Sequence, residues 1–107
     1  MTQPYRSESQ LEKMFHDGVR HGGGMSVKLA PTVAGIPDRL AIWPGGRVEF
    51  VELKTTKGKL RPIQEIWHHR VAKLGINVIV LQGEGEIREY LVWASRGFKQ
   101  QRAAVSS

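Results

Sequence analysis

An acidic and a basic residue two positions apart give this sequence its clearest chemical signal. They are Glu52 and Lys54, which lie at the end of the stretch VEFVELK at residues 48–54. The stretch is typical of a β-strand, in which alternate side chains share a face, so both charged side chains project from the same face. An ion pair on a solvated strand is the ordinary alternative. The apolar neighbours Val51 and Leu53 disfavour that alternative and indicate a functional pair.

A second carboxylate, that of Asp38, is expected beside this pair. The predicted strands at residues 39–43 and 47–54 flank the letters PGG, which fit a three-residue hairpin connection. If these three residues form the whole loop, counting back along both strands places Asp38 opposite Glu52 on the same face. A four-residue loop would turn Asp38 away, and an aspartate after a proline is by itself often a turn residue. With the three-residue register we interpret Asp38 as a metal ligand.

Two carboxylates and a lysine that meet at one place can bind a cation and act on a phosphate. The carboxylates of Asp38 and Glu52 would repel each other unless a positive charge lay between them. Mg²⁺ prefers oxygen ligands and commonly takes one or two carboxylates, water and a phosphate. Such an ion makes a bound water more acidic and stabilises charge on a phosphate under attack. Lys54 would then orient the water or offset that charge, because a lysine that removes a proton needs a strongly lowered pKa.

The hydrophobic pattern predicts the elements that hold these residues in place. In chain order they are a helix at 9–20, strands at 25–29, 39–43 and 47–54, a helix at 62–74 and a strand at 76–81. A last element at 86–93 is left open as strand or helix. The order α-β-β-β-α-β predicts an α/β fold with a mixed sheet flanked by helices, in which the strands before and after the second helix are parallel.

Three packing details follow from the same pattern. An apolar stripe predicts the buried face of the second helix. Its members are Ile63, Ile66, Trp67, Val71 and Leu74. The strand at 76–81 is nearly all apolar, which is typical of a strand covered on both faces. Ser9 and Glu12 have the spacing of a capping box at the start of the first helix.

Composition indicates one small basic domain. We expect a domain at residues 1–94 and a basic, flexible tail at 95–107. Sixteen Lys and Arg against ten Asp and Glu give a net charge of +6, and such a domain most often meets nucleic acid. The absence of cysteine excludes disulfides and thiolate metal sites, and no apolar run suits a membrane span or a signal peptide. These absences fit a protein of a reducing compartment such as the cytoplasm.

The motifs together resemble a known family. The letters IPD and VEFVELK, at residues 36–38 and 48–54, are similar to the P-D…(D/E)-x-K signature of the restriction-endonuclease-like nucleases. That short pattern recurs by chance, but the continuation TKGKLRPIQ at residues 56–64 resembles the hallmark of their VRR-NUC (virus-type replication-repair nuclease) branch. The resemblance covers roughly residues 9–82, and the order α-β-β-β-α-β is the fold of that superfamily.

The resemblance implies a role for each matching residue. Asp38 and Glu52 would bind Mg²⁺ or Mn²⁺, and the main-chain carbonyl of Leu53 would be a further ligand. Lys54 would be the catalytic lysine. Gln64 would support the site from the start of the second helix. A glutamine at the third position of a helix could also merely cap it, but the site role is favoured because the preceding loop returns from the catalytic strand.

Glu12 has two interpretations that the sequence leaves open. The resemblance implies that Glu12 reaches the site from the first helix, as a catalytic residue and a further metal ligand. The capping-box spacing gives the same side chain a structural role without catalysis. Neither interpretation is favoured by the sequence.

The basic loop and the implied family indicate a DNA substrate. Lys57, Lys59 and Arg61 follow the catalytic strand and are well placed to hold phosphates, although a solvated basic loop is the alternative. The resemblance implies a homodimeric DNA-repair endonuclease of phage or bacterial type. It would cut branched DNA such as four-way (Holliday) junctions by metal-assisted hydrolysis, leaving 5′-phosphate and 3′-hydroxyl ends. The alternatives are a nuclease for flaps, nicks or linear duplex, and a non-catalytic DNA-binding module with a nuclease fold.

Overall fold

The computed structural model describes the backbone of residues 6–106 and the side chains of residues 6–96. In chain order its elements are α1 (Glu8–His21), β1 (Met25–Lys28), β2 (Arg39–Trp43), β3 (Arg47–Lys54), α2 (Pro62–Lys73), β4 (Val78–Gln82) and α3 (Gly83–Ser106). The predicted order α-β-β-β-α-β is confirmed. The element left open at 86–93 is helical and belongs to α3.

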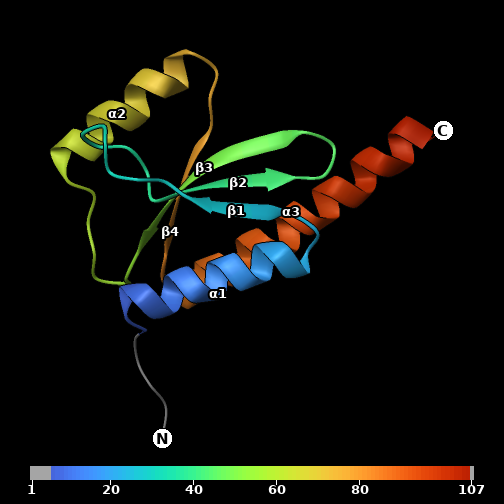
Figure 1. Cartoon of the computed structure of the whole chain (residues 1–107), viewed down its shortest axis with the longest axis horizontal. Helices are drawn as coiled ribbons and strands as arrows, with labels where there is room; N and C mark the ends of the chain where they lie inside the picture. Colours follow the sequence, from blue (N-terminus) through green and yellow to red (C-terminus); the bar gives the residue numbers. More distant parts are fainter. Residues whose placement is uncertain (1–5, 107) are drawn as a thin grey trace, which may run out of the picture.

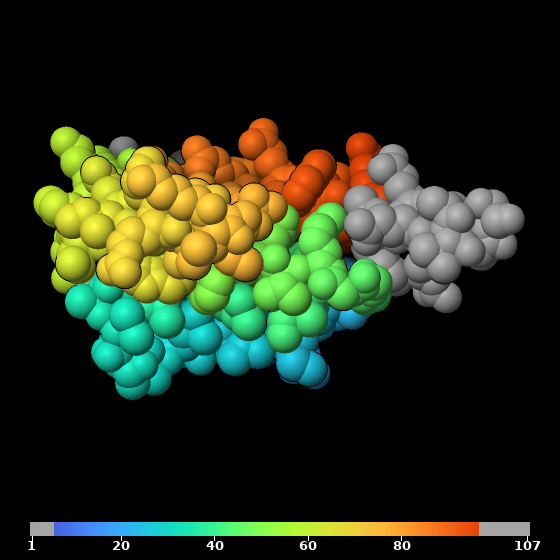
Figure 2. Space-filling view, turned by 90° about the horizontal axis from the view of Figure 1, so that it is seen from above, coloured from blue at the N-terminus to red at the C-terminus, as the bar shows by residue number. Residues whose placement is uncertain are grey.

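The strands form one mixed sheet in the order β1-β2-β3-β4. β1, β2 and β3 are antiparallel neighbours, and β4 pairs with β3 in parallel. Helices α1 and α3 pack against one face of the sheet, here called the inner face, and α2 lies on the opposite, outer face (Figure 1). In the space-filling view from above, the surfaces of α2 (yellow) and of the hairpin that joins β2 and β3 (green) both face the viewer (Figure 2).

The hairpin between β2 and β3 has the three-residue connection that the sequence predicts. Trp43 pairs with Arg47, so residues 44–46 form the whole loop. The two glycines of this loop have φ values of +94° and +91°, a region in which glycine is favoured because it has no Cβ. Counting back along the two strands, this register brings Asp38, directly before β2, opposite Glu52.

The hydrophobic core fills the space between the inner face of the sheet and the helices α1 and α3. α1 contributes Leu11, Phe15 and Val19, the sheet contributes Ala41, Trp43, Val51, Leu53 and Leu81, and α3 contributes Ile87, Tyr90 and Ala94. The α1 residues recur every four positions, which places them on one stripe of the helix. The core therefore fixes the inner face, and Glu52 and Lys54 of β3 project from the outer face.

The outer face is covered less completely than the sequence predicts. Ile63, Ile66 and Leu74 of the expected buried stripe are 41%, 55% and 79% exposed, so the prediction is wrong for them. Within α2, all of whose residues are described, only Gln64 is buried. The helix meets the sheet through Trp67, whose ring packs edge-to-face on Phe50 at 5.1 Å. With so small a contact, Ile63 and Ile66 stay exposed, whereas Trp67 and Val71 are half-buried.

Strand β4 also differs from its prediction. It begins at Val78, and of its described residues only Leu81 is buried. β4 is an edge strand that pairs with β3 alone. Helices α3 and α2 contact it from opposite faces, but four of its five residues are only half-buried, so the expected covering of both faces is partial. The apolar residues of β4 form a parallel pair with β3.

Helix α1 begins earlier than predicted and has a different cap. Ser7 is the N-cap: its hydroxyl accepts a hydrogen bond from the Gln10 main-chain N–H, and the Gln10 side chain accepts one from the Ser7 N–H. The predicted Ser9–Glu12 capping box is therefore wrong. Glu12 lies in the second turn, where its side chain makes other contacts.

The chain beyond residue 94 continues as part of α3, which runs to Ser106. Because the side chains of residues 97–106 lie outside the described residues, the domain boundary at 94 and the flexibility of the tail stay predictions. Within the described part of the chain, no helix is long and apolar enough to cross a membrane.

Candidate active site

Two carboxylates meet where β2 begins and β3 ends. The carboxyl groups of Asp38 and Glu52 lie close enough for the negative charge of Asp38 to raise the pKa of Glu52, and Glu52 is only 1% exposed. Asp38 Oδ2 also accepts a hydrogen bond from the Leu53 main-chain N–H at 2.9 Å. The main chain of Leu53 thus lies beside Asp38, while the ligand role implied for its carbonyl stays a prediction. The strand register that brings the two carboxylates together is the one expected from the hairpin.

Lys54 and Gln64 converge on one oxygen of Glu52. Lys54 Nζ lies 3.5 Å from Glu52 Oε2, and Gln64 Nε2 donates a hydrogen bond to the same oxygen at 2.9 Å. The Gln64 Oε1 atom accepts the Arg61 main-chain N–H at 2.8 Å and so caps α2. The cap and the contact with the site, which the sequence presented as alternatives for Gln64, are made by the same amide group.

The carboxyl group of Glu52 holds its proton more tightly than an ordinary glutamate does. Burial is the main cause, and the negative charge of Asp38 adds to it, so the pKa of Glu52 rises from 4.5 to about 7. The positive charge of Lys54 opposes this shift but does not cancel it. At neutral pH the Glu52 carboxyl group is therefore only partly ionised when no cation is bound.

These residues fit a divalent cation. Glu52 Oε1 is buried and has no hydrogen-bond partner among residues 6–96. An oxygen of this kind is costly to bury unless a cation or a donor occupies its lone pairs. Asp38 supplies a second carboxylate at the same place, and oxygen donors are what Mg²⁺ and Mn²⁺ prefer. Asp38 and Glu52 would hold such an ion, and their role as ligands stays a prediction.

Glu12 does not join this cluster. Its carboxylate Oε1 lies 3.2 Å from Arg39 Nη2 and 3.6 Å from Lys28 Nζ, on the inner face of the sheet. Within the described residues, no group of three or more His, Asp or Glu side chains is arranged to hold a metal. The structure therefore assembles Asp38 and Glu52 without Glu12, and the catalytic role of Glu12 stays a prediction.

The basic loop between β3 and α2 borders the site. Lys57, Lys59 and Arg61 are exposed, as phosphate-binding residues must be. The loop is attached to the end of β4, where Gln82 Nε2 donates a hydrogen bond to the Gly58 carbonyl. The sequence gives no signal for Gln82, because its position beside the loop depends on the β3–β4 register.

One histidine also lies close to the site. His68 is one turn after Gln64 on α2, so the two side chains share a face of the helix. Burial lowers the pKa of His68, and the positive charge of Lys54 lowers it further. The helical spacing from Gln64 is the signal by which the sequence could have placed it there.

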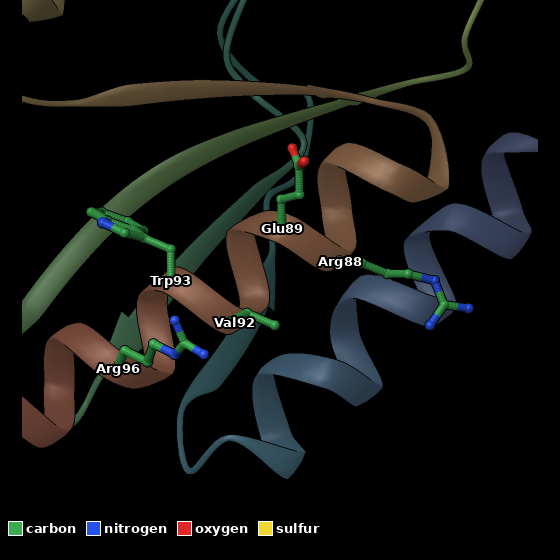
Figure 3. Close-up of a pocket in the computed structure, with 5 residues that line it drawn as sticks. All are labelled: Arg88, Glu89, Val92, Trp93 and Arg96. Carbon is green, nitrogen blue, oxygen red and sulfur yellow. The ribbon is translucent and has the colours of Figure 1, made fainter.

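A hollow lies away from these residues, on α3. It has a volume of about 450 Å³ and is lined by Arg88, Glu89, Val92, Trp93 and Arg96 (Figure 3). Trp93 is 53% exposed, and the guanidinium group of Arg47 lies 4.7 Å from the centre of its ring. None of the residues predicted to bind metal or DNA belongs to this pocket.

Comparison with known proteins agrees with this geometry. The model of the VRR-NUC domain family matches residues 25–85, which is more than half of the chain. The chain belongs to the VRR-NUC family. It is therefore a nuclease domain. The matched segment contains Asp38, Glu52, Lys54 and Gln64, whereas Glu12 lies before its first residue.

Two similar proteins extend the match. The protein named "Putative nuclease p44", from Acyrthosiphon pisum secondary endosymbiont phage 1, is 40% identical over 78 residues, which cover 72% of this chain and 84% of that protein. A solved structure described as a VRR_NUC domain superposes with a TM-score of 0.71 at 32% identity and covers 77% of this chain and 90% of its own. The chain thus resembles both proteins over most of their length.

Proposed function

We propose that this VRR-NUC domain is a Mg²⁺- or Mn²⁺-dependent endonuclease that hydrolyses phosphodiester bonds in DNA. The observation that carries the proposal is the pair of carboxylates Asp38 and Glu52, with Glu52 Oε1 buried and unpartnered among residues 6–96. Lys54 lies beside this pair, 3.5 Å from Glu52. A cation-binding pair next to a fixed positive charge is what hydrolysis of a phosphodiester requires.

Each side chain of the site has a distinct task in this proposal. Asp38 and Glu52 bind the ion, which when present makes a water more acidic and stabilises charge on the phosphate. Lys54 orients the attacking water and offsets negative charge that develops on the phosphate oxygens. Gln64 keeps Glu52 in place through its 2.9 Å hydrogen bond. The Leu53 carbonyl is proposed as a further ligand, because the Leu53 main chain already lies beside Asp38.

Branched DNA, such as a four-way junction, is the proposed substrate. Lys57, Lys59 and Arg61 provide positive charge next to the site, which suits the phosphates of a duplex arm. The domain is too small to grip two arms alone, so a homodimer with two active sites related by a two-fold axis suits paired cuts. The phage origin of the similar nuclease supports a place in DNA repair or replication in the cytoplasm of a bacterial cell.

The outer face of the sheet supports the proposed homodimer. Met25, Ile42 and Val48 lie opposite one another on three adjacent strands and form an apolar row across the sheet. Met25 is 59% exposed and Val48 is 46% exposed. Exposed apolar rows of this kind are typical of surfaces that pair with another chain. A second copy of the same face would cover them.

The first test is a cleavage assay on a labelled four-way junction beside a matched linear duplex and a flap. Each reaction is run with Mg²⁺, with Mn²⁺ and with EDTA, using the wild type and Lys54→Ala. We expect symmetric paired cuts in the junction that need a metal ion. Asp38→Ala, Glu52→Ala and Lys54→Ala should each abolish cleavage, a loss of at least about 100-fold, while circular dichroism shows that the fold is kept. An active Lys54→Ala protein with unchanged metal dependence would contradict the assignment.

The other functions predict different results in the same assay. Cleavage of the flap or the linear duplex in preference to the junction would keep the chemistry and change the substrate. Tight binding of the junction without cleavage in either metal would favour a non-catalytic DNA-binding module. The buried, unpartnered oxygen of Glu52 argues against that module, because a purely binding surface gains nothing from carboxylates that face phosphates.

A further inference from the structure

Gln82 lies beside the catalytic lysine at the end of β4. In the parallel pairing of β3 and β4, Gln82 is the partner of Lys54, so both side chains are on the outer face. Neither the family motif nor the periodicity of the sequence singles out this glutamine. Two contacts hold this part of the structure in place. Lys54 contacts Glu52, and the Gln82 main-chain N–H donates a hydrogen bond to Glu86 Oε1 at 2.8 Å.

The side chain of Gln82 ties down the basic loop. Gln82 Nε2 donates a hydrogen bond to the carbonyl of Gly58, which is the residue between Lys57 and Lys59. The Gly58 N–H in turn donates to the Thr55 carbonyl at 3.0 Å and closes a turn. The loop therefore contains a closed turn, and the Gln82 side chain of β4 holds that turn at Gly58.

Gly83, the residue after Gln82, allows the loop to pack closely against the start of α3. A Cβ atom at residue 83 would lie 2.5 Å from Thr56 Cγ2, and the φ value of Gly83 is +83°. Any larger residue would push Thr56 away and strain the backbone. The loop thus packs closely on the junction of β4 and α3, and the Gln82 hydrogen bond fixes its orientation there.

We propose that Gln82 is a positioning residue that holds Lys57 and Lys59 in the orientation needed to bind backbone phosphates of the DNA substrate. The inference rests on the proposed function, because it assigns a role in substrate binding. Without this anchor the loop between β3 and α2 would have to be ordered when DNA binds, and that ordering weakens affinity. With the anchor, the two lysines are placed before the DNA arrives.

The tether can be tested without DNA, because trypsin cleaves after Lys57 and Lys59. Timed digestion of the wild type and Gln82→Ala is followed by mass spectrometry of the loop peptides. We expect cleavage in this loop to become several-fold faster in Gln82→Ala, with the thermal midpoint changed little. Glu89→Ala, a change on the exposed surface of α3, serves as the matched control and should digest like the wild type. Unchanged cleavage at both lysines in Gln82→Ala would overturn the inference.

The consequence for binding is tested by fluorescence anisotropy on a labelled four-way junction in Ca²⁺, over a series of salt concentrations. We expect Gln82→Ala to bind about three- to tenfold more weakly, the effect of about one hydrogen bond, and the slope of log affinity against log salt to fall by about 1. At saturating DNA in Mg²⁺ the cleavage rate should match the wild type. A defect in that rate with unchanged affinity would overturn the inference.

A double-mutant cycle decides whether Gln82 acts through the lysines. Gln82→Ala is added to a Lys57→Ala/Lys59→Ala background, and its effect on affinity should then disappear. An undiminished effect in that background would mean that Gln82 acts by another route and would overturn the inference. Failure of the proposed function gives a separate result: the wild type then fails to bind or cut DNA, while the trypsin experiment still reports on the tether.

Discussion

The Gln64 side chain donates a hydrogen bond to Glu52 Oε2 at 2.9 Å while it accepts the main-chain N–H of Arg61 at 2.8 Å. One buried amide group therefore joins the first turn of α2 to the carboxylate of β3. The relationship explains why Gln64 is the buried residue of a helix that is otherwise exposed or half-exposed in the structure. It also means that the orientation of Glu52 depends on a residue that would not itself touch the metal ion.

Replacement of Gln64 should separate these two tasks. Gln64→Ala removes both hydrogen bonds, and we expect the affinity for Mg²⁺ or Mn²⁺ and the cleavage rate to fall by about 10- to 100-fold. Gln64→Glu keeps an acceptor for Arg61 but replaces the donor to Glu52 with a carboxylate. We expect this variant to keep α2 capped and yet to lose activity. Isothermal titration measures the affinity for the metal ion, and circular dichroism measures the helix content. A fully active Gln64→Glu protein would contradict the proposed role of the hydrogen bond to Glu52.

Metal binding should become stronger as the pH rises. The pKa of Glu52 in the metal-free protein is about 7, and only the deprotonated carboxylate binds a cation. Below pH 7 the metal therefore competes with a proton, and we expect affinity to rise by up to about tenfold per pH unit until the pH passes the pKa. Calorimetry at several pH values in buffers of different ionisation enthalpy would show the released proton. Affinity that is independent of pH below 7 would contradict the raised pKa.

The stability of the metal-free protein should change with pH in the opposite direction. Because folding raises the pKa of Glu52 from 4.5 to about 7, the folded protein binds a proton that the unfolded chain has released. This contribution is fully present below pH 4.5 and is lost as the pH rises through 7. Urea unfolding in EDTA should thus show a free energy of unfolding that decreases over this interval. Glu52→Gln, which cannot titrate, should give a smaller decrease.

The apolar row on the outer face should determine the oligomeric state. Val48→Glu places a charge in the row formed by Met25, Ile42 and Val48, and we expect it to shift a dimer toward monomer. Val92→Glu is the matched control, because Val92 is 52% exposed but lies on α3. Sedimentation at micromolar concentration measures both proteins. Identical sedimentation of the wild type and Val48→Glu would remove this face as the dimer interface.

A buried polar network on the inner face should matter for stability rather than for cleavage. The Tyr90 hydroxyl accepts a hydrogen bond from Trp43 Nε1 at 2.9 Å and donates one to Glu49, which is 2% exposed. Burial and the hydrogen bond to Glu49 raise the pKa of Tyr90, so its hydroxyl keeps its proton. Tyr90→Phe leaves Glu49 without this donor and should lower the free energy of unfolding by about 1–3 kcal/mol. Urea denaturation tests this value, and activity per folded molecule should be unchanged.

The sequence by itself determined the strand that carries the site and the residues opposite it. The letters PGG favour a three-residue hairpin loop, and the register that such a loop sets decides which side chains of residues 48–54 face Asp38. The observed pairing of Trp43 with Arg47 is that register. Asp38, Glu52 and Lys54 could therefore be placed together from their positions in the chain alone. The motif at residues 56–64, which closely follows Glu52 and Lys54, also indicated the family.

Only the tertiary structure decided the contacts between elements that are distant in the chain. Glu12 has the right residue type to bind a metal, but packing of α1 against the inner face pairs it with Arg39. Ile66 has helical periodicity, but α2 covers too little of the sheet to bury it. Gln82 meets Gly58 because β3 and β4 pair in one particular register. Local patterns encode which face a side chain lies on, whereas its partner depends on how the faces pack, and that is a property of the whole fold.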